Sequence, residues 1–138
     1  MFHYLKFANY FLSTLLGIST ILLGQHWILV GFGIFVAFYV IGDAFFGEDM
    51  SQPKLNNKMF LDAMLYASVP TTILRLSVCL WIVTPYNWAF MHWISDHFVY
   101  DFVAAKQNTS LLELAVAVVF CGLMLSGVAT VVGHELVH

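Results

Sequence analysis

Two histidines four positions apart are the residues of this chain best suited to chemistry. His134 and His138 enclose Glu135 in the pattern H-E-x-x-H, and the segment before them is predominantly apolar. Residues four apart share one face of a helix, so both imidazoles can bind a single ion. The pattern therefore predicts a metal site at the point where an apolar helix meets water.

The identity of the metal depends on ligands beyond this pair. A catalytic zinc site needs a third protein ligand and uses the intervening Glu as general base. An oxygen-activating iron site uses several more imidazoles or carboxylates and keeps positions open for O₂. His26, His92 and His97 are expected on the opposite side of the membrane, and His3 lies at the chain terminus. We therefore expect the missing ligands to come from outside this chain.

The composition predicts an all-α integral membrane protein. Of 138 residues, 61% are apolar and 9% charged, whereas soluble domains carry about 25% charged residues. The net charge of −3 without a basic tract argues against nucleic acid as a partner. Four segments are long and apolar enough to cross a bilayer, which takes about 20 helical residues. They are Phe7–Gly24, Trp27–Phe46, Met59–Val83 and Leu111–Gly133.

The segments between these spans complete the predicted fold. The sequence G-Q-H-W at 24–27 predicts a tight turn that makes a hairpin of the first two spans. The stretch from Thr84 to Ser110 alternates aromatic residues with His and Asp, which favours one interfacial helix. We therefore expect about four transmembrane helices plus one interfacial helix, forming a single domain over residues 1–138.

The lysines predict which side of the membrane each end occupies. Lys6, Lys54 and Lys58 share one side of the four-span arrangement, and Lys106 lies in the loops of the other. Cytoplasmic loops collect Lys and Arg. The N-terminus and the histidine pair are therefore expected in the cytoplasm.

Three further residue types in the spans have structural interpretations. Cys79 and Cys121 both lie in apolar runs, so we expect small buried hydrophobes and no disulfide. Arg75 is expected to extend its head group to the outer interface. Pro70 is expected to kink its helix where neighbours satisfy the freed carbonyl.

An acidic stretch follows the second span. Asp43, Glu48 and Asp49 fall within seven residues, and Asp43 is expected in the last turn of the helix. An ionisable residue near hydrocarbon depth is costly and is a functional candidate. The alternative is an ordinary acidic loop at the end of a span.

Three motifs together resemble one known family. The stretch "GDAFFGED", followed by a polar loop with a proline, the Val-Pro-containing span "YASVPTTILRLSVCLWIV" and the terminal "GHELVH" occur in this order. They resemble the acidic motif, the third span and the first histidine box of the membrane-bound alkane hydroxylases (alkane 1-monooxygenases). This family is part of the integral-membrane fatty acid desaturase and hydroxylase superfamily.

The resemblance implies a multi-pass, iron-dependent monooxygenase of the bacterial inner membrane. Such enzymes insert one atom of O₂ into a terminal C–H bond of an alkane, with electrons from rubredoxin and rubredoxin reductase. His134 and His138 would be the first ligands to two irons, and Glu135 would have an outer-shell role that orients ligands. The acidic motif would organise the cytoplasmic side.

The chain departs from the family in one respect. The family carries further histidine boxes, of the H-x-x-x-H-H and H-x-x-H-H types, and two more membrane helices, and neither is present here. We therefore expect an amino-terminal portion of a longer hydroxylase domain, an incomplete six-helix desaturase-like bundle that is inactive alone.

A substrate tunnel is predicted along the second span. Gly31, Phe35 and Tyr39 are spaced by four and share a face with Asp43. Phe35 would limit the length of the alkane and Gly31 would permit extra depth. The alternative is that this face meets lipid or a neighbouring helix.

Two other functions fit part of the pattern. An intramembrane zinc metalloprotease would use Glu135 to activate a zinc-bound water. It leaves the acidic motif unexplained. A non-enzymatic interpretation treats the chain as a helical membrane module that binds no metal by itself.

Overall fold

Six helices make up the described part of the chain. A computed structural model describes the backbone of residues 2–46 and 58–137, and the side chains of residues 11–41, 59, 63 and 66–126. Those residues contain no strand, so the all-α prediction is confirmed for them. The helices are α1 (Phe2–Leu23), α2 (His26–Phe46), α3 (Lys58–Val83), α4 (Ala89–His97), α5 (Phe102–Gln107) and α6 (Leu111–Val137).

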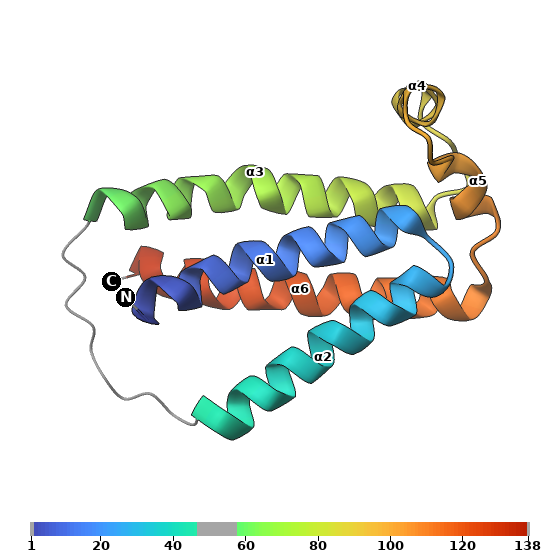
Figure 1. The fold of residues 1–138 in the computed structure, drawn as a ribbon. Helices are drawn as coiled ribbons and strands as arrows, with labels where there is room; N and C mark the ends of the chain where they lie inside the picture. The colour runs from blue at the N-terminus through green and yellow to red at the C-terminus, as the bar shows by residue number, and fades with distance from the viewer. Residues whose placement is uncertain (1, 47–57, 138) are drawn as a thin grey trace.

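The four long helices run alternately in opposite directions (Figure 1). Helix α1 contacts α2, α3 and α6, and α3 and α6 pack against each other. Helix α2 contacts α1 and α6 and diverges from them toward its carboxyl end (Figure 1). We call the end that holds α4, α5 and the α1–α2 turn the cap end, and the opposite end the terminal end.

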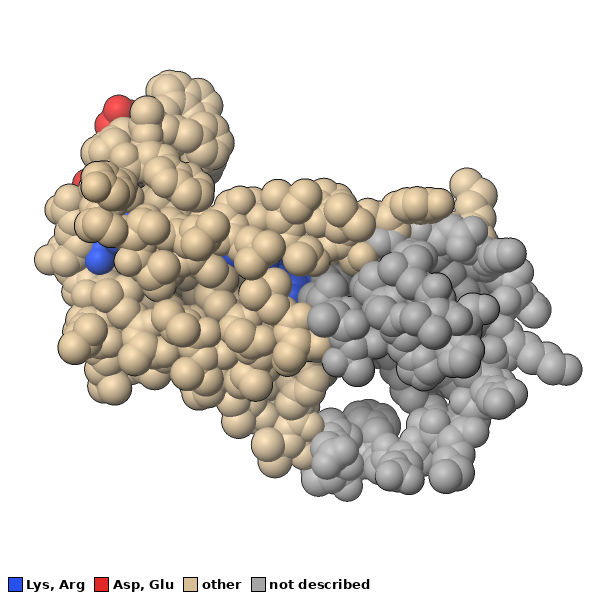
Figure 2. Space-filling model, turned by 180° about the vertical axis from the view of Figure 1, so that it is seen from behind, with Lys and Arg blue, Asp and Glu red and all other residues tan. Residues whose placement is uncertain are grey.

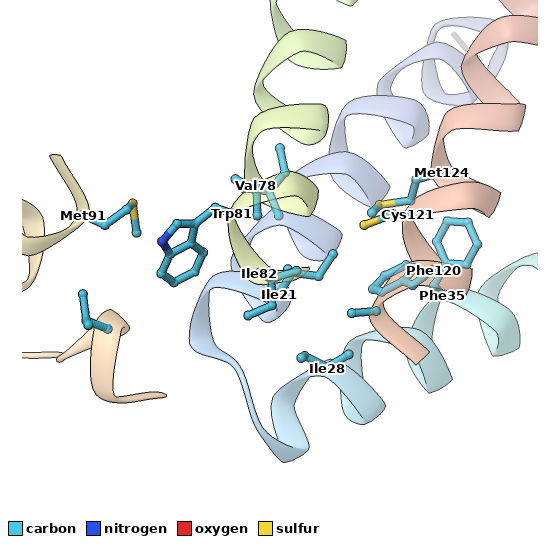
Figure 3. Packing of buried hydrophobic residues seen from close by; sticks show 13 residues of the cluster. Ile21, Ile28, Phe35, Val78, Trp81, Ile82, Met91, Phe120, Cys121 and Met124 are labelled. Atoms are coloured by element: carbon cyan, nitrogen blue, oxygen red, sulfur yellow. The ribbon is translucent and has the colours of Figure 1, made fainter. Parts of the chain in front are cut away.

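The described hydrophobic core occupies the cap-side half of the bundle (Figure 3). Ile82 of α3 lies beside Ile21 of α1, Trp81 of α3 is directed toward Met91 of α4, and Phe120 of α6 lies near Phe35 of α2. Each of these side chains is buried. Each buried side chain makes many van der Waals contacts, which are individually weak and together stabilise the packing. The remaining buried members are Ile18, Ile28, Val78, Val103, Ala117, Cys121 and Met124.

Two glycines let α1 approach its neighbours closely. A Cβ at Gly31 of α2 would overlap the side chain of Thr20 on α1. A Cβ at Gly17 of α1 would overlap the thioether of Met124 on α6. Small residues at helix contacts let the backbones come together. These contacts therefore fix how closely α1 approaches α2 and α6.

The predicted turn between the first two spans is confirmed. Gly24 and Gln25 both have positive φ, 67° and 50°, a conformation that costs glycine little. The turn is held from outside, because the Gln25 N–H donates to Thr109 Oγ1 at 3.0 Å. The Tyr100 hydroxyl donates to the Leu23 carbonyl at 2.6 Å. The cap therefore closes over the hairpin.

Two short helices replace the single interfacial helix that we predicted. Asp101 accepts a hydrogen bond from the Ala104 N–H at 2.9 Å and so begins α5 separately from α4. Ser110 and Glu113 then form a capping box: the Ser110 N–H donates to Glu113 Oε2 at 2.7 Å, and the Glu113 N–H donates to Ser110 Oγ at 3.4 Å. These side chains set where α5 and α6 start.

One of the predicted spans meets a length-and-hydropathy criterion within the described residues. The Tyr66–Val83 segment of α3 is apolar and long enough to cross a membrane. The described apolar parts of the other long helices are shorter, at Phe11–Leu23, His26–Ile41 and Leu111–Ser126. The helix bounds nevertheless lie close to those of the four predicted spans.

The two cysteines form a disulfide, so our prediction of separate buried thiols was wrong. Cys79 of α3 is bonded to Cys121 of α6, with a Cα–Cα distance of 6.4 Å. Both cysteines do lie in apolar surroundings, which the sequence indicated. The sequence did not indicate that α3 and α6 are neighbours, and this contact brings the two sulfurs together.

The contact between α1 and α2 can be tested with two glycines of the same helix. We expect Gly31→Ala to destabilise the protein by about 1–3 kcal/mol, because overpacking forces the helices apart. Gly33 has no heavy atom within 4 Å of an added Cβ. Gly33→Ala should therefore be neutral or stabilising, because alanine favours helix over glycine by about 1 kcal/mol. Thermal unfolding in detergent, followed by circular dichroism, measures both. Equal effects would contradict the contact.

Candidate functional site

The predicted metal ligands and acidic residues lie outside the described side chains. They are His134, Glu135, His138, Asp43, Glu48 and Asp49. The backbone of α6 is helical through Val137 and that of α2 through Phe46, so the positions 134, 135 and 43 stand on described helices. Both helices end at the terminal end of the bundle (Figure 1). The direction of the helices thus brings the two motif-bearing segments to one end.

The described residues give no second candidate for a metal site. Among them, no group of three or more His, Cys, Asp or Glu side chains could hold an ion. His26, His92 and His97 are exposed, and they belong to the start of α2 and to α4, at the cap end. They are therefore separated from the terminal end by the length of the bundle, as the four-span arrangement predicted.

The three tunnel candidates face three different surroundings. Gly31 packs against Thr20 of α1. Phe35 is 7% exposed and lies against Phe120 of α6, with ring centroids 5.1 Å apart. The Tyr39 ring lies 4.6 Å from the Phe35 ring, measured between centroids, but Tyr39 is half exposed. The stripe therefore begins in the α1 contact and ends on the surface, and a substrate tunnel along it stays a prediction.

Arg75 lies inside the bundle, so our expectation that it reaches the outer interface was wrong. Its side chain is 2% exposed. It stands eight residues before Val83, a helical distance of about 12 Å, which is more than its side chain spans. One guanidinium nitrogen, Nη1, donates to the Met124 carbonyl at 2.6 Å, and Nη2 donates to Thr14 Oγ1. A charge in a membrane span normally faces the bundle interior, and that rule was the available signal.

Lys106 lies at the cap end, where it connects α5 to the end of α3. Its ammonium donates to the Tyr86 carbonyl at 2.8 Å and lies 5.1 Å from the centre of the Trp81 ring. Burial lowers the pKa of this amine, because desolvation disfavours its charged form. The hydrogen bond and the ring both favour the charged form. Lys106 therefore joins α5 to the end of α3 and belongs to the scaffold of the cap.

Helix α4 presents a row of aromatic rings to its surroundings. Phe90 and Trp93 stack with centroids 6.1 Å apart, and Trp93 lies 4.4 Å from the His97 ring. His97 Nδ1 is pinned to the Trp93 carbonyl at 2.8 Å. Trp93 is 54% exposed, while Met91 on the inner face is buried. Figure 2 shows few charged atoms on the described part of this view, consistent with an apolar environment.

Comparison of the chain with protein-family models, with curated proteins and with solved structures finds no match. The case for a function therefore stands on the motifs and on the geometry above.

The predicted tunnel can be tested with two phenylalanines one turn apart. In the hydroxylase expressed from its full reading frame, we expect Phe35→Ala to shift the products toward longer alkanols, because a buried ring is removed. Phe38→Ala is the matched control, since Phe38 is 54% exposed on the outer face. Chain-length profiles by gas chromatography measure the shift. An unchanged profile in Phe35→Ala, or an equal shift in Phe38→Ala, removes the tunnel from this stripe.

Proposed function

We propose that this chain supplies the first histidine box of a membrane di-iron alkane hydroxylase. The observation that carries the proposal is the shared end of α2 and α6, because the acidic motif and the H-E-x-x-H pattern stand on these two helices. A metal centre needs donors from more than one element in one place. Helices α2 and α6 run in the same direction, so each would contribute from its carboxyl end.

The donor set fits iron only as part of a larger site. His134 and His138 offer two imidazoles four positions apart, which suits one face of a helix. Two imidazoles cannot saturate two irons, so the remaining ligands would come from residues outside this chain. Glu135 would hold the box in position and would not act as a base.

The reaction would be terminal hydroxylation of an alkane by O₂. One oxygen atom would enter the C–H bond, and the other would leave as water, with two electrons from rubredoxin and two protons from the solvent. The irons would supply O₂ activation. The residues of this chain would hold the metals, exclude water through the apolar core and orient the alkane along the helices.

Membrane integration is the second part of the proposal. Four antiparallel spans, with α4 lying in the interface beside α5, would put the terminal end in the cytoplasm. The lysine distribution supports this orientation. The disulfide supports it independently, because Cys79 stands four residues from the cap end of α3. Disulfides persist in oxidising compartments such as the periplasm, which this orientation gives to the cap end.

Metal analysis tests the proposed chemistry. The protein purified in detergent from its full reading frame should contain about two irons per chain. His134→Ala should lose most of this iron and the NADH-dependent hydroxylation of octane. His92→Ala, at the cap end, is the matched control and should keep both. One zinc per chain would instead indicate the metalloprotease, and absence of metal would leave a membrane module without a metal centre.

Thiol labelling tests the proposed orientation. The two native cysteines are both consumed in the disulfide, so an introduced cysteine is the sole free thiol. Gln107→Cys, at the exposed cap, should react with a membrane-impermeant maleimide in intact spheroplasts. Met59→Cys, at the start of α3, should react only after the membrane is opened. The opposite pattern would reverse the orientation and remove the cytoplasmic metal centre.

A further inference from the structure

A buried guanidinium ties together three of the long helices. Arg75 is on α3, its Nη1 donates to the Met124 carbonyl of α6, and its Nη2 donates to Thr14 of α1. Thr14 itself is 1% exposed. A guanidinium presents its donors in a rigid plane. Two bonds from the two Nη atoms to different helices therefore fix how those helices are turned.

Met124 is contacted at both its ends. Its carbonyl accepts from Arg75, and its thioether fills the space beside Gly17 of α1. One turn toward the cap, Cys121 is bonded to Cys79, which stands one turn beyond Arg75 on α3. Helices α3 and α6 are thus joined on successive turns by one polar and one covalent link.

The polar link is the one nearer to the histidine box. Ten residues separate Met124 from His134, about 15 Å along a continuous helix. A shift of α6 by one residue turns its face by about 100°. The box would then point to another part of the bundle. A buried charge is costly compared with an apolar side chain, and its best-attested benefit is to specify register.

We propose that Arg75 is a positioning residue that sets the register and rotation of α6, and so the direction in which α6 presents His134. The proposal rests on the proposed function for its metal readout. The thioether contact at Gly17 sets how closely α1 approaches, and the disulfide holds the cap half. Arg75 holds α3 and α6 together one turn nearer to the terminal end than the disulfide does.

The metal readout compares variants in the enzyme from its full reading frame. Arg75→Met removes both hydrogen bonds, and we expect iron affinity to fall at least about tenfold, as for other residues that support ligands. The absorption spectrum of the remaining centre should change. Arg75→Lys, which keeps a donor, should restore part of the affinity. Leu74→Met is the matched control, since Leu74 is half exposed on the same helix, and it should leave iron unchanged.

The disulfide reports whether each variant is folded. Arg75→Met should still form the Cys79–Cys121 bond, seen as protection from a maleimide-polyethylene glycol gel shift. If Arg75→Met fails to fold, two variants of Thr14 test the proposal instead. Thr14→Ser keeps the hydroxyl that accepts from Arg75 and should keep the iron. Thr14→Val removes that hydroxyl and should lower the affinity for iron. Folded variants with unchanged iron affinity and spectrum would overturn the proposal.

A second readout needs no metal. Nitroxides at Val69→Cys on α3 and Leu123→Cys on α6, both exposed positions, are placed in a background with both native cysteines changed to Ser. Arg75→Met should shift or broaden the distance distribution, and Leu74→Met should not. An unchanged distance distribution in Arg75→Met would overturn the proposed positioning role of Arg75. A wild-type enzyme that contains no iron would instead overturn the proposed function. The distance between the two nitroxides would then still test the role of Arg75.

Discussion

The contact between α3 and α6 is the constraint on which the rest of the bundle depends. These helices are distant in sequence, and the polar stretch with α4 and α5 lies between them. Their contact carries a disulfide and the hydrogen bond from the buried guanidinium of Arg75 to the Met124 carbonyl. Helix α1 packs against both α3 and α6, so its position depends on where they lie. Helix α2 packs against α1 and α6, and its position depends on the turn at Gly24 and the close approach at Gly31.

The two ends of the bundle are built differently. At the cap end, side-chain hydrogen bonds from Tyr100, Thr109 and Lys106 hold the backbone of the hairpin and of the α3–α4 connection. The interior there is mostly apolar, and its buried polar residues include Thr20 and Lys106. From Arg75 toward the terminal end, buried side chains such as Thr14 and Ser68 are polar. Within the described residues, the two halves of the bundle interior therefore differ in polarity.

Hydropathy predicted the long helices well, because their apolar length is a property of each segment alone. The S-x-x-E pattern at Ser110 could have been found in the same way, since a capping box is local. The disulfide could not be derived locally, because it depends on which helices are neighbours. The inward direction of Arg75 could have been predicted from its place in a span, but its partners depend on the same helix contact. Gly31 was predicted to give a substrate tunnel extra depth, whereas Thr20 of α1 lies in the space beside it, and that neighbour is set by a tertiary contact. The metal ligands remain a prediction from their motif.

The sulfur bond also makes the cap part of a covalent ring. It joins residues 42 positions apart, and α4 and α5 lie between them. Proteolysis at the fully exposed Val99 would open this ring without releasing either fragment. The severed chain would migrate as one molecule until a reductant was added. After such a nick in the peptide backbone of the cap, α3 and α6 would stay joined.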